Sequence, residues 1–211
     1  YRVSMRILHT SDWHIGRTFH GNSTMDALAE VLGALTAQVR DNAVDVVVIA
    51  GDVFDSATPS GAAYTLLGDA LVALHETGAR VIVTSGNHDS AARLGFQARL
   101  LREGIHVLTD PLAVGVPVTV ADAHGPVHFF GIPYLEPGIV RQHWPEGDGS
   151  GRQLRTQAQT MAHAMDLVRA GMARHEGRSV AIAHCFAAGV DATVGLEREV
   201  RQGGLDVVPL S

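Results

Sequence analysis

Short apolar runs alternate along the chain with longer segments in which apolar residues recur at helical spacing. The runs predict strands at 6–10, 44–50, 80–84 and 178–183. The run at 44–50 (VDVVVIA) is apolar almost throughout, which indicates a strand covered on both faces. The helical spacing predicts four helices, which extend from Ser23 or Thr24 to Asp41, over 60–77, over 91–103 and over 153–173.

The second half of the chain has a different pattern. From His106 to Ile132 the apolar runs are short and broken by Pro and Gly, which is typical of antiparallel strands. The strand–helix order of the first half predicts a sheet of parallel strands, which the antiparallel strands of the second half would extend. Glu146–Gly151 (EGDGSG) is expected to form a surface loop, and the residues beyond Ala183 show no strong periodicity.

The composition excludes several classes of protein. With 211 residues, 46% of them hydrophobic and 18% charged, the chain can bury a core and is not intrinsically disordered. It contains no apolar run of about 18 residues and no signal-peptide pattern. Its single cysteine, Cys185, excludes an internal disulfide, so we expect a cytoplasmic protein. All 16 basic residues are Arg, which excludes a Lys nucleophile or a P-loop Lys.

Residues that carry carboxylate, imidazole or amide groups follow each clear strand. They are Asp12 and His14, Asp52 and Asp55, Asn87 and His88, and His184. Because ligands bind beyond the carboxyl ends of the strands in such sheets, we expect these side chains to meet at one edge. Asp12 and His14 are two positions apart and would point to the same side of an extended segment.

Taken singly, each of these residues has a structural explanation, such as a turn, a helix cap or a hydrogen-bonded core histidine. Together they favour a metal site. Carboxylate, amide and imidazole groups without a thiolate suit Mn²⁺, Fe²⁺ or Zn²⁺. The candidate ligands Asp12, His14, Asp52, Asn87 and His184 exceed what one open catalytic ion uses. Asp52, at the end of the central apolar strand, is the natural bridge between two ions.

The segments HTSDWHIGRTFHG (9–21), GDVFD (51–55), SGNHDS (85–90) and IAHCFAAG (182–189) carry this chemistry. They resemble the calcineurin-like metallophosphoesterase superfamily, and the first three are similar to its SbcD family of bacterial nuclease subunits. The resemblance covers nearly all of Met5–Ser211. It implies an α/β fold, a four-layer α/β/β/α sandwich of two mixed sheets. It also implies a cofactor of two divalent cations, Mn²⁺ by preference.

The same resemblance implies a function and a role for each site residue. Asp12 and His14 match ligands of one ion, Asp52 the bridge, and Asn87 and His184 ligands of the other. His88 matches a catalytic residue that faces the scissile phosphate, and Asp55 matches the residue that orients it. The implied activity is DNA phosphodiester hydrolysis in repair and recombination, exonucleolytic on duplex ends and endonucleolytic on hairpins or single strands. The implied partners are DNA, an SbcC-type ATPase and a second copy of the chain.

The superfamily's final G-H-x-H motif, which supplies one further histidine to each ion, is absent from this sequence. We therefore expect residues 5–211 to be an incomplete nuclease core with weak activity or none. The small capping domain and the ATPase-binding segment would lie outside it. Residues 1–4 precede Met5, which resembles a natural start, and are expected to be foreign to the natural chain.

Two alternatives remain open. The same ions could serve another dinuclear phosphoesterase, such as a protein phosphatase or a nucleotide phosphodiesterase, or the domain could be a non-catalytic scaffold for dimerisation or DNA docking. The net charge of −6 provides no general positive field for DNA, so local contacts would have to come from residues such as Arg17, Arg93 and Arg99. The helices predicted over 60–77 and 91–103 are the candidates for a dimer contact.

Overall fold

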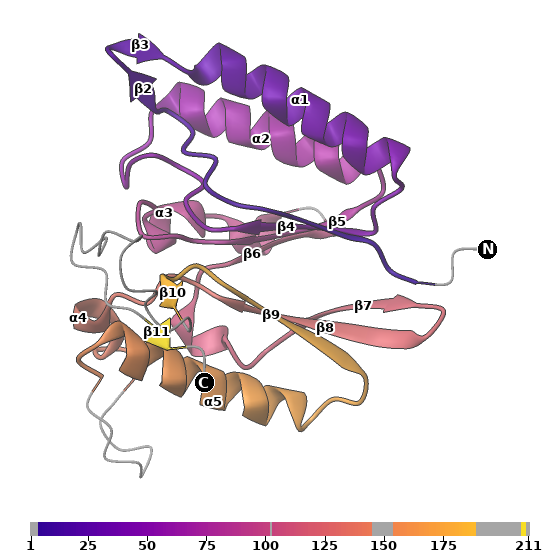
Figure 1. Cartoon of the computed structure of the whole chain (residues 1–211), viewed down its shortest axis with the longest axis vertical. Helices are drawn as coiled ribbons and strands as arrows, with labels where there is room; N and C mark the ends of the chain where they lie inside the picture. The colour runs from indigo at the N-terminus through magenta and orange to yellow at the C-terminus, as the bar shows by residue number, and fades with distance from the viewer. Residues whose placement is uncertain (1–3, 102, 145–153, 189–207, 210–211) are drawn as a thin grey trace, which may run out of the picture.

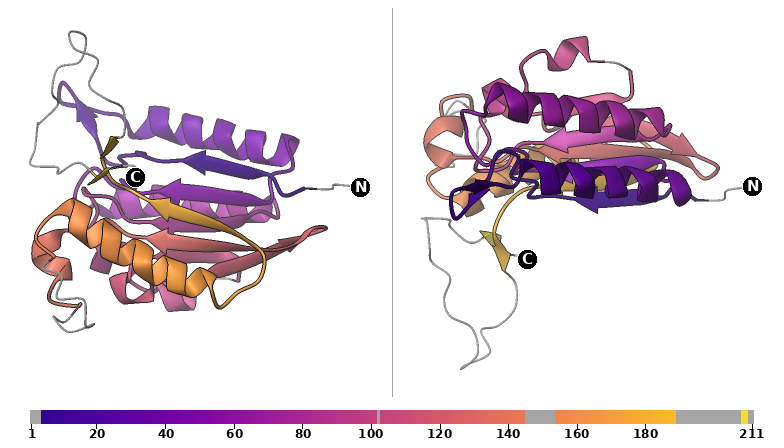
Figure 2. Two further views of the ribbon diagram at one scale, coloured as in Figure 1. Left: turned by 60° about the horizontal axis from the view of Figure 1, so that its bottom comes forward. Right: turned by 90° about the horizontal axis from the view of Figure 1, so that it is seen from above.

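The computed structural model describes residues 4–101, 103–144, 154–188 and 208–209. These residues form the expected α/β/β/α sandwich (Figure 1). Helices α1 (Met25–Asp41) and α2 (Gly61–Glu76) lie side by side over the outer face of one sheet (Figure 2). Helix α5 (Gln157–Met172) covers the outer face of a second sheet, and the two sheets face each other.

The first sheet is parallel throughout its described strands. Its order is β1 (Ile7–Thr10), β4 (Val46–Ala50), β5 (Arg80–Thr84) and β6 (Ile105–Leu108). All residues of β4 are buried, as its apolar run predicts. His106 lies in β6, which pairs parallel with β5, so the prediction that antiparallel strands begin at His106 is wrong.

The second sheet is separate and mixed. Strands β7 (Val118–Asp122) and β8 (Gly125–Ile132) form an antiparallel hairpin, and β9 (Arg178–Ala183) pairs parallel with β8. The prediction that these strands extend the first sheet is therefore wrong. Residues 127–132 of β8 are all buried, because one face of this strand packs against the first sheet and the other against α5.

The remaining described elements are short and lie in the connections. They are β2 (Thr18–Phe19), β3 (Asn22–Ser23), α3 (Ala91–Leu94), α4 (Pro137–Val140), β10 (Ala187–Ala188), β11 (Val208–Pro209) and the 3₁₀ turns η1 (Ala98–Leu100) and η2 (Pro111–Ala113). Within the described ranges, no helix has both the length and the apolar character to cross a membrane.

Two predicted helices differ from the structure. The helix predicted over 91–103 ends at Leu94, because Gly95 follows and Gln97 takes a left-handed φ of 63° that interrupts the helical hydrogen bonds. Helix α5 begins at Gln157 rather than 153. The Thr156 hydroxyl accepts from the backbone N–H of Gln159, which closes a capping box at that point. Residue 153 and the predicted loop Glu146–Gly151 lie outside the described residues.

Three apolar clusters hold the layers together, and the one between the sheets bears directly on the site. In it, Val46, Val48 and Ile82 of the first sheet pack against Val127, Phe129 and Ile182 of the second. The other two clusters lie between each sheet and its covering helices. The inter-sheet cluster fixes the ends of β4, β5 and β9 relative to one another.

Replacing Phe129 tests this inter-sheet packing. Phe129 is 0% exposed, so Phe129→Ala should lower the free energy of unfolding by about 3–5 kcal/mol. Val31, on α1, is 61% exposed, and Val31→Ala should change it by less than about 0.5 kcal/mol. Urea unfolding followed by circular dichroism measures both. A loss below about 1 kcal/mol for Phe129→Ala would contradict the stacking of the two sheets.

Candidate metal centre

The loops that follow β1, β4, β5 and β9 meet at one edge of the sandwich. A cavity of about 460 Å³ opens there, and five of the seven predicted site residues line it: Asp12, Asp52, Asn87, His88 and His184. The other two, His14 and Asp55, lie beside it and contact each other. The structure therefore brings all the sequence-predicted site residues together.

Asp52 lies at the centre of this group. It is 3% exposed, and its Oδ2 atom lies 3.5 Å from Nε2 of His184, 3.7 Å from Nε2 of His14 and 4.0 Å from Nε2 of His88. The Oδ1 atom accepts a hydrogen bond of 2.9 Å from the backbone N–H of His88. One carboxylate thus faces three imidazole nitrogens.

The separations between these polar atoms fit ligands of a shared cation. His14 Nε2 lies 3.8 Å from Asp12 Oδ1 and 3.7 Å from Asp52 Oδ2, which is beyond ordinary hydrogen-bond distance. Two ligand atoms that are each about 2.1 Å from one ion lie at most ~4.2 Å apart. On the other side of Asp52, Nε2 of His184 lies 3.2 Å from Oδ1 of Asn87. The donor set and its spacing fit divalent metal ions.

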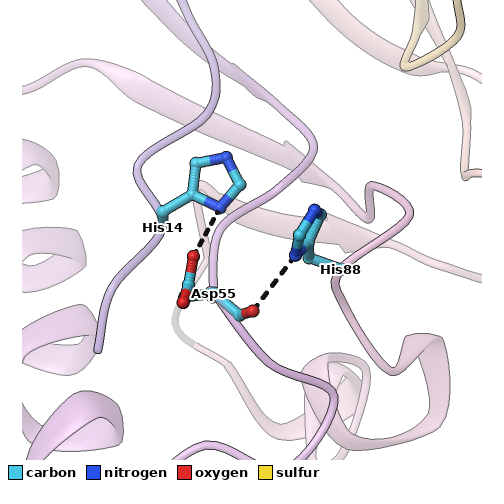
Figure 3. A group of neighbouring side chains, drawn as sticks. All are labelled: His14, Asp55 and His88. Carbon is cyan, nitrogen blue, oxygen red and sulfur yellow. Dashed lines mark hydrogen bonds and ion pairs between the residues drawn. The ribbon is translucent and has the colours of Figure 1, made fainter. Parts of the chain in front are cut away.

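The Nδ1 atom of each of the three histidines faces an oxygen acceptor. His184 donates from Nδ1 to the carbonyl of Ala50 at 2.9 Å, and His88 donates from Nδ1 to the carbonyl of Asp55 at 3.1 Å. Nδ1 of His14 lies 3.2 Å from Oδ1 of Asp55 (Figure 3). These contacts direct each Nε2 atom toward the Asp52 carboxylate, and an acceptor on the other ring nitrogen is usual for histidines that bind metals.

Asp55 differs from its expected role in one respect. The resemblance implied that its side chain orients His88, but the carboxylate faces His14 and the backbone carbonyl holds His88 (Figure 3). One residue therefore orients two imidazoles. The spacing of the G-D-x-x-D motif could not show which group of Asp55 reaches which histidine, because that depends on the turn between Val53 and Asp55.

The backbone is left-handed at three of the candidate ligands, two of which, Asp12 and His14, were expected in an extended segment. Asp12, His14 and Asp52 have φ values of 57°, 45° and 48°, a conformation that is uncommon outside glycine. Two hydrogen bonds between the loops after β1 and β4 hold this conformation. Asp12 N–H donates to Gly51 O at 3.1 Å, and His14 N–H donates to Asp52 O at 3.0 Å. Asp12 and His14 both face Asp52, as predicted. The predicted cause, an extended segment, is wrong, because both residues have a left-handed backbone.

Three residues that support the site were not assigned a role from the sequence. The Asp89 carboxylate accepts hydrogen bonds from the backbone N–H groups of Val53, Phe54 and Gly86, and so ties two loops together. Gly51 and Gly86 allow close approach, because a Cβ on Gly51 would lie 2.5 Å from the His184 ring and one on Gly86 would overlap Asp52. Asp89 could have been found from the sequence, because it is the acidic residue of the G-N-H-D segment at 86–89. A single sequence carries no signal for the close contacts of Gly51 and Gly86.

The electrostatics of the cavity favour positive charge. Burial alone would raise the pKa of Asp52, but the His184 imidazole and the backbone N–H of His88 outweigh it and lower the pKa. The hydrogen bond to Asp52 raises the pKa of His184 to about 9, against the effect of burial. Burial raises the pKa of Cys185, which keeps its thiol protonated at neutral pH. A carboxylate site that holds a proton on a neighbouring imidazole is suited to exchange that proton for a metal cation.

Comparison with known proteins agrees with this geometry. Residues 5–150 match the calcineurin-like phosphoesterase family. The chain belongs to this family. Members of the metallophosphoesterase fold use divalent metals, and the grouped His and Asp side chains of this chain are consistent with that.

Among curated proteins, the chain is similar to the SbcD subunit of the SbcCD nuclease from two bacteria. It is 42% identical to that of Bacillus subtilis (strain 168) over 119 residues, which is 54% of this chain and 30% of the relative. It is 33% identical to that of Rhodobacter capsulatus over 226 residues, which is 97% of this chain and 54% of the relative. The resemblance to the SbcD family is thereby confirmed. The chain spans about half or less of the length of these relatives.

Adding one methyl group at Gly86 should disturb the loop that holds Asp52, because a Cβ there would overlap the backbone nitrogen of Asp52 as well as its side chain. A Cβ there would overlap the Asp52 carboxylate, so Gly86→Ala should weaken Mn²⁺ binding at least tenfold in calorimetric titration. Gly33→Ala is the matched control. A Cβ at Gly33, in α1, meets nothing within 4 Å, so this change should leave binding intact and stabilise the chain by about 0.5–1 kcal/mol. Equal Mn²⁺ affinity in Gly86→Ala and the unmodified chain would contradict the assigned position of Asp52.

Proposed function

We propose that this chain is the core of a metal-dependent nuclease that hydrolyses DNA phosphodiester bonds. The observation that carries the proposal is the grouping of Asp12, His14, Asn87 and His184 around the buried carboxylate of Asp52. The candidate ligand set alone would serve the hydrolysis of DNA or of another phosphoester. The nuclease names of the two relatives favour DNA.

The candidate ligands divide into two groups that share Asp52. Asp12 and His14 would hold one cation, and Asn87 and His184 would hold the other. Mixed carboxylate, imidazole and amide ligands suit Mn²⁺. Bound divalent cations would polarise the phosphate and lower the pKa of an attacking water. The residues of the chain contribute by fixing these ligands in a rigid cavity, so that little reorganisation accompanies the reaction.

His88 is the candidate for proton transfer. Its side chain is 44% exposed at the cavity, while its Nδ1 atom is fixed on the Asp55 carbonyl. The Nε2 atom is then the one that can hold a proton for the leaving oxygen. General acid catalysis of this kind typically contributes about 10²–10⁴-fold to the rate.

The substrate and partners of the whole protein follow from the same proposal. The substrates would be duplex ends, hairpins or single strands of DNA, and the partner would be an SbcC-type ATPase. The whole protein would act in the cytoplasm, in repair and recombination. Arg17, Arg93 and Arg99 are exposed and are candidates for backbone contacts. The Arg93 guanidinium is already anchored, because it donates from Nη1 to the carbonyl of Ala57 at 2.7 Å.

We also propose that a second copy of the chain packs against α2. A groove of about 750 Å³ runs between α2 and the segment 93–101, and its lining is mainly apolar. Large apolar side chains are exposed around it, including Phe96 at 74% and Leu100 at 80%. Exposure of this kind often marks an interface between proteins. The helix predicted over 60–77, one of the two candidates for a dimer contact, forms one side of this groove.

Two substitutions separate metal binding from catalysis in a chain that also carries the G-H-x-H motif. Asp52→Asn keeps the size of the side chain but removes the bridging charge, so Mn²⁺ binding and DNA cleavage should both be lost. His88→Ala should keep Mn²⁺ and lower kcat about 10²–10⁴-fold. His124→Ala, at an exposed turn between β7 and β8, is the control and should change neither. Calorimetry and cleavage of labelled duplex ends are the measurements.

The same experiment discriminates between the competing functions. An Asp52→Asn variant that still binds two Mn²⁺ ions would refute the proposal that the Asp52 carboxylate bridges them. Rapid turnover of a nitrophenyl phosphate monoester without Mn²⁺-dependent cleavage of DNA would identify a phosphatase instead of a nuclease.

A further inference from the structure

A second cavity lies directly beside the metal centre. Its volume is about 700 Å³, and it shares Asn87 and Tyr134 with the metal cavity. The residues that follow β5, β6 and β8 form its floor and sides, together with α3 and α4. It therefore opens at the same edge of the sandwich at which ligands of α/β sheets bind. A molecule whose phosphate occupies the metal cavity would extend naturally into this cleft.

Tyr134 forms the boundary between the two cavities and is held at both ends. Its backbone N–H donates to the carbonyl of Ser85 at 2.8 Å, at the end of β5. Its hydroxyl accepts from Nε2 of Gln157 at 2.9 Å, and Gln157 is only 6% exposed. The ring is thus fixed before any ligand arrives, so a ligand that packs on it loses little free energy to ordering the side chain.

The chemistry of the cleft disfavours phosphate. No Arg lines its described surface, and its charged residues are the carboxylates Asp89, Asp110 and Glu136; His143 and Tyr134 are the other titratable residues. Asp89 is occupied by three backbone N–H groups, and Oδ1 of Asp110 accepts from the backbone N–H of Leu112 at 2.9 Å, but Asp110 and Glu136 are both exposed. The cleft therefore suits a neutral group that carries N–H donors.

Apolar side chains supply the rest of the lining. They include Ala91, Ala92, Pro111, Pro133 and Ile139, and Ile139 is 59% exposed on α4. Apolar and aromatic surfaces stack on the faces of nucleobases, while carboxylates can accept from their exocyclic amino groups. A nucleobase on its sugar combines both properties in one ligand.

We propose that this cleft is the subsite for the nucleoside next to the scissile phosphate, with Tyr134 and Ile139 against the base. The inference rests on the proposed function, because the phosphate of the same nucleotide would lie in the metal cavity. Charge complementarity and continuity with the metal centre through Asn87 and Tyr134 are the observations that select this occupant.

The test compares two probes that differ only by the base. Binding of 2′-deoxycytidine 5′-monophosphate and of 2-deoxyribose 5-phosphate to this chain is measured by calorimetric titration, with and without Mn²⁺. The nucleotide should bind about tenfold more tightly than the sugar phosphate. Ala92 is exposed and lines the cleft, so Ala92→Trp should fill it and reduce the difference to less than twofold. Ala29→Trp, at an exposed position of α1, is the matched control and should keep the tenfold difference.

Tyr134→Ala should likewise remove the preference for the base, whereas Tyr134→Phe keeps the ring and should retain most of it. Equal affinity of the unmodified chain for the two probes would overturn the subsite, as would a tenfold difference that survives Ala92→Trp. A preference for the base that persists while Mn²⁺ has no effect on either affinity would support the subsite and contradict the metal-dependent function instead. The two proposals can therefore fail separately.

Discussion

The buried carboxylate of Asp52 is the constraint on which the site depends. It ends the central strand β4, whose residues are all buried, and it is itself 3% exposed. An anion in that position is unfavourable unless positive or N–H groups surround it. The chain provides the His88 backbone N–H and three imidazoles, those of His14, His88 and His184, which belong to three loops distant from Asp52 in sequence. The same arrangement that stabilises the carboxylate forms a cavity suited to cations.

The two-sheet architecture makes this arrangement possible. Asp12, Asp52 and Asn87 follow strands of the first sheet, whereas His184 follows β9 of the second. The His184 ring is anchored on the carbonyl of Ala50, and the backbone N–H of Tyr134 donates to the carbonyl of Ser85, so hydrogen bonds join the ends of the two sheets at the site. The apolar layer around Phe129 sets the distance between those ends. The geometry of the candidate metal ligands is thus a consequence of how the sheets pack.

The sequence predicted the outline of the fold and the members of the site, but not the local geometry. Strand ends and motif spacing were enough to group Asp12, Asp52 and His184. They could not reveal the left-handed turns at Asp12 and His14, because these depend on hydrogen bonds to the loop after β4. The pattern over 91–103 appeared helical, yet the left-handed residue Gln97 interrupts it. The apolar runs after His106 could not show which sheet they join, since that is decided by packing between layers.

The central claim is that the Asp52 carboxylate is a ligand of divalent cations, and anomalous diffraction tests it most directly. Crystals of the chain equilibrated with Mn²⁺ would be measured on both sides of the manganese absorption edge. The account predicts anomalous density in contact with the Asp52 carboxylate, on the side of Asp12 and His14, on the side of Asn87 and His184, or on both. Density confined to other parts of the surface, with none beside Asp52 at saturating Mn²⁺, would contradict it.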